Sequence, residues 1–152
     1  MADMIVRKAE EKDIPSLIEL VKGYLEFYKR PIPEDQNIAD FILHFIKHPE
    51  EGCQFVAEEE GRLVGFTTLV AIWSTTRLGK VGLLNDLFVN PSDRKKGIAE
   101  KLMYRTMEEG KERGYPLLRL LTAHDNIPAQ SLYEKTGWNA PGWKVYDYDS
   151  SQ

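Results

Sequence analysis

The sequence predicts an α/β (α+β) fold with one mixed, mostly antiparallel sheet flanked by helices. Its 152 residues are 42% hydrophobic and 29% charged, which suits one core that folds alone. Strand and helix periods alternate along the chain without repeats or linkers. A strand, helix, strand unit between Val81 and Thr122 adds one parallel pair to strands otherwise joined as hairpins. A single domain over residues 1–152 is therefore expected.

The N-terminal third predicts one strand and two helices. Ile5–Lys8 has a short strand pattern, and Asp13 is positioned to cap a helix that continues to about Phe27. Apolar residues recur in this helix every three or four positions, as one buried face requires. After a loop with two prolines, a second apolar stripe at Ile38–Ile46 predicts another helix, which ends at His48-Pro49.

The rest of the chain predicts five more strands or strand segments and two helices. A hairpin is expected around Glu60-Gly61-Arg62, and Gly114 followed by Pro116 marks the end of the helix that opens at Gly97. The short apolar run after that helix is typical of a buried parallel strand. In chain order we expect strands at 54–59, 63–76 and 81–89, a helix at 97–114, a strand at 117–122, a helix at 126–136 and a last strand at Trp143–Tyr148.

Composition excludes several classes of protein. The formal net charge of −4 argues against a nucleic-acid surface, which requires a basic patch, and favours small or cationic partners. The one cysteine, Cys53, cannot form an internal disulfide, so a cytoplasmic setting is expected, with Cys53 as a small buried residue at a strand start. No apolar run approaches the roughly 20 residues of a spanning helix, and no signal-peptide pattern is present, so neither membrane insertion nor export is expected.

The run Arg94-Lys95-Lys96-Gly97-Ile98-Ala99, between a strand and a helix, is suited to hold a pyrophosphate. A glycine-bearing turn that opens a helix directs unpaired backbone N–H groups, and the positive end of the helix dipole, at one point. Gly97 permits close approach or positive φ, small Ala99 leaves room, and the three cations add charge. An ordinary helix start with a solvated basic cluster is the alternative.

A second motif follows at Asn126, Ala129, Tyr133 and Gly137. The first run resembles the acetyl-coenzyme A signature (Q/R)-x-x-G-x-(G/A) of the GNAT family of N-acetyltransferases, and the second resembles that family's N-x-x-A-x-x-(L/F)-Y-x-x-x-G segment. The resemblance extends over nearly the whole chain, because the first strand and helix also match. The segment from Leu84 to Val89 is most similar to the branch that contains polyamine and thialysine acetyltransferases.

This resemblance implies a GNAT fold, with six to seven strands, about four helices and a splayed parallel strand pair at its centre. It implies acetyl-CoA as donor, bound by Arg94–Ala99, by the backbone of Leu87, Phe88 and Val89, and by Asn126 beside Ala129. Acetyl transfer in the family is direct, without an acyl-enzyme, and no metal is expected.

Transfer to an amine needs a held thioester, an unprotonated amine and a proton donor for the thiolate. Tyr133 is the candidate donor, since a tyrosine hydroxyl is ordinarily protonated at neutral pH and helical spacing places it on the face of Asn126 and Ala129. A core aromatic is the alternative. Side chains alternate along a strand, so only one of Asn85 and Asp86 is expected to face the acceptor.

Asn85 stands where the similar branch often has glutamate, and asparagine cannot accept the amine's proton. A water relay through Asp86, another carboxylate, or an acceptor that arrives deprotonated remains open. The exposed acids Glu26, Glu34 and Asp35 either attract a cationic acceptor or form a solvated rim.

The function expected is acetyl-CoA-dependent acetylation of a primary amine of a small molecule: an amino acid, a thialysine-like compound or a polyamine. The alternatives are a protein N-terminus or lysine as acceptor, a catalytically silent coenzyme A-binding module, and an ATP-using phosphate-binding protein. A homodimer that shares or swaps Trp143–Tyr148 is left open.

The three histidines carry weaker signals. His44 and His48 have a possible metal spacing of four residues, but no third type of ligand is recognised with them, so exposed or capping histidines are expected. His124 is either at the mouth of the site or an ordinary loop residue.

Overall fold

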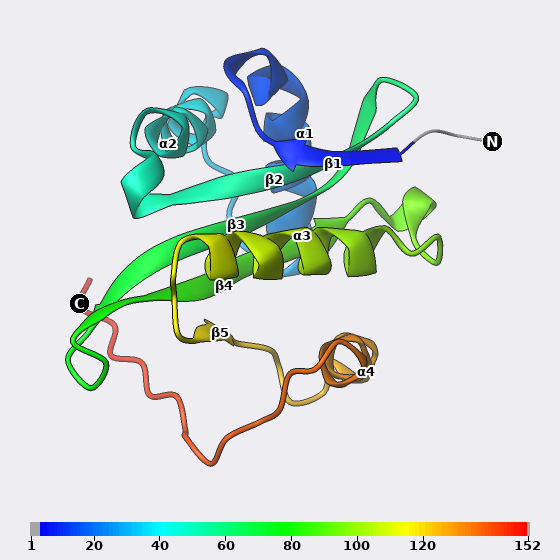
Figure 1. Ribbon diagram of the computed structural model, residues 1–152. Coiled ribbons are helices and arrows are strands. Elements are labelled where there is room, and N and C mark those ends of the chain that lie inside the picture. Colours follow the sequence, from blue (N-terminus) through cyan, green and yellow to red (C-terminus); the bar gives the residue numbers. More distant parts are fainter. Residues whose placement is uncertain (1–3, 152) are drawn as a thin grey trace. The chain divides into compact units, whose positions relative to one another are not determined.

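The computed structural model describes residues 4–151. It forms two compact units, one that ends at Leu121 and one that begins at Thr122 (Figure 1). The expectation of a single domain remains a prediction. None of the helices within the described residues is both long and apolar enough to cross a membrane.

The first unit is built on one five-stranded sheet with the order β1-β2-β3-β4-β5. Its first four strands are joined antiparallel, and β4 and β5 are parallel, as the strand, helix, strand pattern predicts (Figure 1). The strands are β1 Met4–Lys8, β2 Gly52–Glu59, β3 Arg62–Ser74, β4 Gly79–Val89 and β5 Leu118–Leu120.

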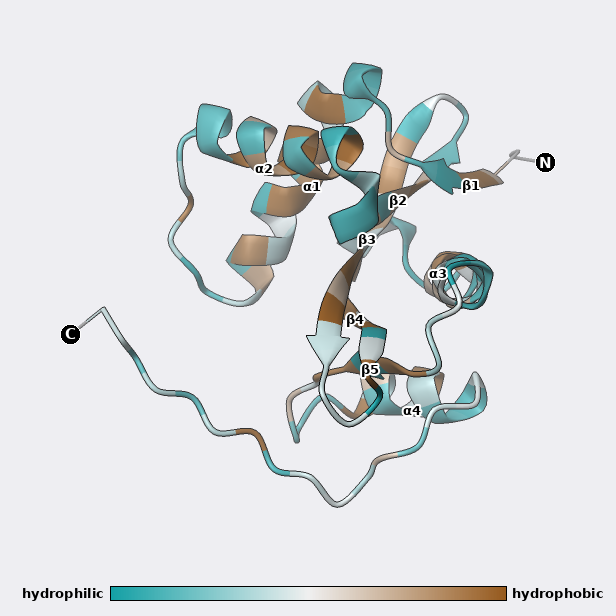
Figure 2. Ribbon diagram, turned by 60° about the vertical axis from the view of Figure 1, so that its left-hand side comes forward, coloured by the Kyte–Doolittle hydropathy of each residue, from teal (hydrophilic) through white to brown (hydrophobic). Residues whose placement is uncertain are grey.

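Helices cover both faces of this sheet. α1 (Ile14–Phe27) and α2 (Asp35–Lys47) lie on one face and α3 (Ile98–Glu112) on the other (Figure 1). Alternation along the strands supplies both cores: Val56 packs on the α1–α2 side, and its neighbour Phe55 packs with residues of α3. Each of these helices carries both apolar and polar residues, as a helix with one buried side requires (Figure 2).

The turn between β2 and β3 has the backbone conformation of a tight hairpin. Glu60 and Gly61 have φ of 52° and 77°, the two left-handed residues that a tight hairpin between β2 and β3 requires.

Asp13 does precede α1, but its side chain makes no cap hydrogen bond to that helix. Its carboxylate instead accepts the Glu10 N–H at 2.7 Å and two hydrogen bonds from Arg7, at 2.7 and 2.8 Å. The predicted capping role of Asp13 is therefore wrong.

The expected last strand at Trp143–Tyr148 does not form. No strand is assigned there, and every ladder within residues 4–151 joins two of β1 to β5, so the sheet has five strands and not six or seven. A strand pattern becomes a strand only when a neighbour completes its hydrogen bonds. The side chains of Trp143, Val145, Tyr146 and Tyr148 are instead 60–88% exposed.

The second unit contains one helix, α4 (Ile127–Lys135), within the residues described. The Asn126 side chain caps it by accepting the Ala129 N–H at 3.3 Å. Gly137, at φ 100°, follows its end.

Candidate functional site

The turn between β4 and α3 has the backbone shape of an anion site. Gly97 has φ 79° and ψ 10°, and Lys95 has φ 67°. A β-carbon on Gly97 would meet no atom within 4 Å, so glycine is favoured there by backbone conformation and the space beside it is open. The Ile98 side chain is buried, so at this position the chain offers a ligand its backbone N–H, together with the other N–H groups of the first turn of α3. The geometry matches the predicted turn, and its ligand remains a prediction.

Arg94 anchors this turn to the end of β4. Its Nε–H donates to the Val89 carbonyl at 3.1 Å. Its guanidinium lies 5.4 Å from the Phe27 ring centre and 5.7 Å from that of Phe88. The side chain is nevertheless exposed, so the rest of the guanidinium can reach a phosphate.

Lys96 is held by carboxylates. Its ammonium lies 3.3 Å from Glu59 and 3.4 Å from Asp93, and both acids raise its pKa. Asp93 is buried and also accepts two hydrogen bonds from Arg62, at 2.9 and 3.2 Å. Of the three predicted phosphate ligands, Lys96 is thus the one whose charge is already balanced, whereas Lys95 has no ion pair within residues 4–151.

The second half of β4 has a strand partner on one side only. The parallel ladder pairs Gly82, Leu83 and Leu84 with β5 and ends there, because β5 ends at Leu120. Beyond it, Leu87, Phe88 and Val89 pair with β3 alone among residues 4–151. Alternate backbone N–H and C=O groups of this segment point away from β3. The parallel ladder stops after three residue pairs, as the predicted splay requires, but the pair lies at the edge of the five-stranded sheet described for residues 4–151 and not at its centre as predicted. The open edge of β4 has the shape for an added strand.

A β-bulge in β4 explains the splay and separates the two candidate proton acceptors. Asp86 pairs with Thr68 and Leu84 pairs with Leu69, so Asn85 is the extra residue. A bulge bends a strand and interrupts its ladder, and this one lies directly after the last parallel pair. Asn85 is exposed and Asp86 is half-buried. Side chains alternate strictly only in a regular strand. The bulge, and not alternation, therefore explains why Asn85 and Asp86 differ in exposure.

The Asp86 carboxyl is hydrogen-bonded to two hydroxyl side chains, one of which, Tyr24, belongs to an aromatic cluster. Burial raises the pKa of its carboxyl, while hydrogen bonds from the Tyr24 and Thr68 side chains oppose that rise. Thr68 Oγ1 in turn accepts a hydrogen bond from the Gln54 amide at 3.0 Å. The Tyr24 ring packs edge-on against Phe66, with ring centres 6.0 Å apart. A carboxyl with a raised pKa holds a proton more readily than an ordinary surface carboxyl, which is what a proton acceptor requires.

The second motif begins at the N-cap of α4, runs through that helix and ends at Gly137 just after it. Asn126 occupies the N-cap position, and Ala129 and Tyr133 follow at three and seven positions, so the three share one helix face. Tyr133 is half-buried. Asn126 has a structural task that sequence reasoning missed, since its side-chain oxygen accepts the Ala129 N–H. Its amide nitrogen is not used in that bond.

Comparison with known proteins identifies the family. The profile of the acetyltransferase (GNAT) family matches residues 15–138, most of the chain. The chain belongs to the GNAT acetyltransferase family. An uncharacterized N-acetyltransferase of Bacillus subtilis, YhfO, is 33% identical over 135 residues, which cover 89% of each chain. The pig thialysine N-epsilon-acetyltransferase is 25% identical, with 98% of this chain and 94% of that one covered.

Solved structures agree with this assignment. A probable acetyltransferase superposes with a TM-score of 0.87 at 26% identity, covering 97% of this chain and 99% of the other. The protein is therefore an acetyltransferase, and the predicted resemblance and reaction class are confirmed.

Sequence reasoning did not find the partners of Asp86 in this GNAT acetyltransferase. Tyr24 belongs to the predicted apolar stripe of α1, and nothing local to Thr68 or Gln54 marks them. The contacts of Tyr24 and Thr68 with Asp86, and of Gln54 with Thr68, depend on how α1, β2, β3 and β4 meet, and no short-range pattern encodes that.

His44, in the last turn of α2, and His48, directly after that helix, have acidic neighbours that the sequence pattern did not reveal. His44 Nε2 lies 3.2 Å from Glu51, and His48 Nδ1 lies 3.5 Å from Glu50. The expectation that no third type of ligand lies beside them is therefore wrong. Cys53 is buried near the start of β2 as predicted, and burial raises the pKa of its thiol, which disfavours a nucleophilic thiolate.

Proposed function

We propose that this acetyltransferase moves the acetyl group of acetyl-CoA directly to a primary amine of a small molecule, with an amino acid of the thialysine type as the first candidate. The observation that carries the proposal is the pairing, in one strand, of an open edge at Leu87–Val89 with a hydrogen-bonded carboxylate at Asp86. The first holds a donor, and the second accepts a proton.

The residues present fit acetyl-CoA. The pantetheine amides would pair with the open edge of β4 as an added strand does, and a main-chain N–H there would polarise the thioester carbonyl. The pyrophosphate would lie on the N–H groups that follow Gly97, near Arg94 and Lys95. Asn126 of the second unit would bond the pantetheine arm.

The chemical step is a direct displacement. The amine nitrogen attacks the thioester carbonyl carbon, the C–N bond forms and the C–S bond breaks. Asp86 takes the proton that the amine loses, and the Tyr133 hydroxyl gives its proton to the departing sulfur. No residue is acylated, which agrees with the buried Cys53 thiol.

A primary amine suits this site because its cationic form is drawn to the Asp86 carboxylate. It gives up one proton to solvent, attacks as the neutral amine, and passes a second proton to Asp86 as the amide forms. The net charge of −4 favours such an acceptor at long range. The named activity of the pig relative, on the epsilon-amine of thialysine, supports an amino-acid side chain as the first acceptor to test.

The experiment is thiol release from acetyl-CoA across a panel of acceptors: D- and L-amino acids, thialysine, polyamines, aminoglycosides and peptides with free N-termini. Each rate is compared with background hydrolysis, and mass spectrometry locates the acetyl group. A selective hit on a free amine supports the proposal. Release with peptides alone would move the assignment to a protein substrate, and no release from protein that acetyl-CoA stabilises would contradict it.

We also propose that two copies associate through residues 143–148. Four large side chains of this segment are 60–88% exposed, which is costly for a protein that stays monomeric. Light scattering tests this: a dimer mass that Val145→Asp together with Tyr146→Asp converts to a monomer mass supports it, and a monomer mass for the unaltered chain overturns it.

A further inference from the structure

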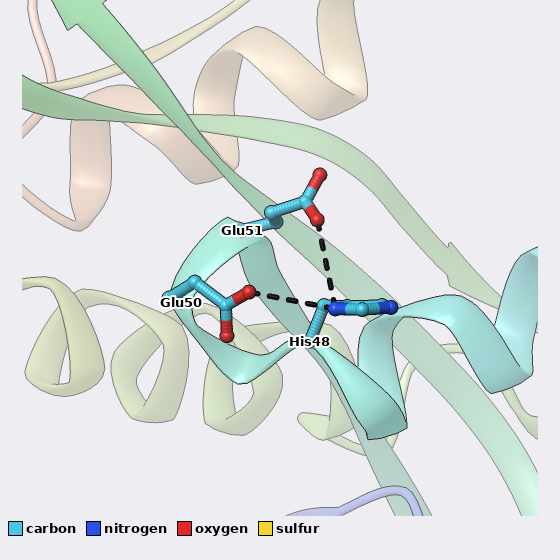
Figure 3. Close-up of side chains that lie close together, drawn as sticks. All are labelled: His48, Glu50 and Glu51. Atoms are coloured by element: carbon cyan, nitrogen blue, oxygen red, sulfur yellow. Dashed lines mark ion pairs between the residues drawn. The ribbon is translucent and has the colours of Figure 1, made fainter.

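Four side chains of the types that bind metals gather where α2 ends. His44 and His48 are one helical turn apart, with ring centres separated by 4.6 Å. Glu50 and Glu51 follow in a short 3-10 turn, and the ligand atoms of His48, Glu50 and Glu51 all lie within 4.8 Å of one another. Figure 3 shows both carboxylates directed at the His48 ring.

The backbone holds this cluster in place. The His48 N–H donates to the His44 carbonyl at 2.9 Å and so closes the last turn of α2. The Glu51 N–H donates to the His48 carbonyl, also at 2.9 Å, so the next turn brings the acidic residues back over the imidazoles. Pro49 fixes φ at the start of that turn. The side chains therefore need only small rotations to converge on one point.

Three of the spacings between ligand atoms are close to those around a transition-metal ion. Bonds of about 2.0–2.1 Å in a tetrahedral zinc site place the ligand atoms roughly 3.3 Å apart. Here Glu51 Oε2 lies 3.2 Å from His44 Nε2 and 3.9 Å from His48 Nδ1, and Glu50 Oε1 lies 3.5 Å from His48 Nδ1. Two imidazoles with carboxylates favour Zn²⁺ or a similar ion, whereas Mg²⁺ and Ca²⁺ favour oxygen ligands alone.

We propose that His48, Glu50 and Glu51, with His44 as a fourth ligand, form a binding site for one divalent transition-metal ion of the Zn²⁺ type. All four side chains are about half-exposed, between 47% and 61%, so an ion reaches them from solvent. Two cations contact the backbone of this turn: Lys80 donates to the Glu50 carbonyl and lies over the Trp73 ring, and Arg113 donates to the Pro49 carbonyl at 2.6 Å. The site borders a hollow of about 320 Å³ that contains none of the residues proposed for acetyl transfer.

The test is calorimetric titration of tag-free full-length protein with ZnCl₂, in the absence of coenzyme A, whose thiol would compete. We expect one saturable site. Loss of an outer-shell partner of a bound metal costs roughly 10–100-fold in affinity, so loss of a ligand in His48→Ala or Glu51→Gln should weaken binding by more than about tenfold. The matched control is His124→Ala, which alters the chain's third histidine and should leave affinity within about twofold.

Cobalt(II) gives a second readout, because its visible spectrum reports tetrahedral nitrogen and oxygen coordination. That spectrum should be present in the unaltered protein and in His124→Ala, and absent in His48→Ala. Absence of saturable binding in the unaltered protein would overturn the proposal. Binding that survives both His48→Ala and Glu51→Gln would do the same. Thiol release should be unchanged in His48→Ala, so this test is separate from that of acetyl transfer.

Discussion

Replacement of Tyr24 by phenylalanine tests the role of Asp86 most specifically. The Tyr24 hydroxyl donates to the Asp86 carboxylate and lowers its pKa. A hydrogen bond to a charged group contributes about 1.5–3 kcal/mol, and one pKa unit corresponds to about 1.4 kcal/mol. Loss of this bond should therefore raise the pKa of Asp86 by roughly one to two units. The ring itself stays, so packing against Phe66 and Phe88 should be retained.

The assay is kcat/KM for thiol release as a function of pH, with acetyl-CoA saturating and one acceptor throughout. Asp86 must be ionised to take a proton, so activity falls as the pH drops through its pKa. In Tyr24→Phe this acidic limb should move to higher pH by about one to two pH units, with a smaller change at the plateau. Use of a single acceptor removes the amine's own titration from the comparison.

Tyr28→Phe is the matched control, since Tyr28 is exposed one turn further along the chain and its ring centre lies 4.9 Å from that of Tyr24. Its acidic limb should coincide with that of the unaltered enzyme. An acidic limb that stays in place in Tyr24→Phe, or moves to lower pH, would refute the assignment of Asp86 as the proton acceptor.

Three further predictions concern the same unit. Gly97→Ala should raise the KM for acetyl-CoA and lower the melting temperature, because φ 79° strains a residue that has a β-carbon. Gly61→Ala, at φ 77° in the hairpin, should lower the melting temperature by a similar amount and leave that KM unchanged. Asp86→Asn should raise the melting temperature at pH 7: burial raises the folded-state pKa above the unfolded one, so ionisation destabilises the fold, and the gain should vanish below the unfolded pKa of about 3.9. Asp93→Asn should lower the melting temperature at pH 7. Arg62 depresses the pKa of Asp93, so its contribution is present above the unfolded pKa and lost as pH falls through the folded one; a deficit that persists in acid would contradict this.

Much of the first unit follows from local patterns. The alternation of β2 and β3 and the left-handed pair Glu60-Gly61 are short-range features, and the structure confirms the hairpin that they predict. Helix periods likewise placed α1 and α3 within a few residues of their observed bounds. These elements are encoded by neighbours in the sequence, so reasoning from sequence reaches them.

The features that failed depend on distant partners. Trp143–Tyr148 has a strand's composition, but a strand also needs a paired edge, and sequence does not show whether one is supplied. The bulge at Asn85 arises from the register between β3 and β4, which is a property of two strands together. Sequence therefore identified Asp86 as a candidate without revealing that Tyr24 and Thr68 tune it.

The most direct test of the proposed function is acceptor-dependent thiol release by the unaltered enzyme, Asp86→Asn and Tyr133→Phe, measured side by side with the best acceptor of the panel. General acid or base catalysis contributes about 10²–10⁴-fold, so each variant should lose activity in that range while its melting curve still shows a folded protein stabilised by acetyl-CoA. Full activity in both folded variants would contradict the account, because the proton transfers would then belong to other groups.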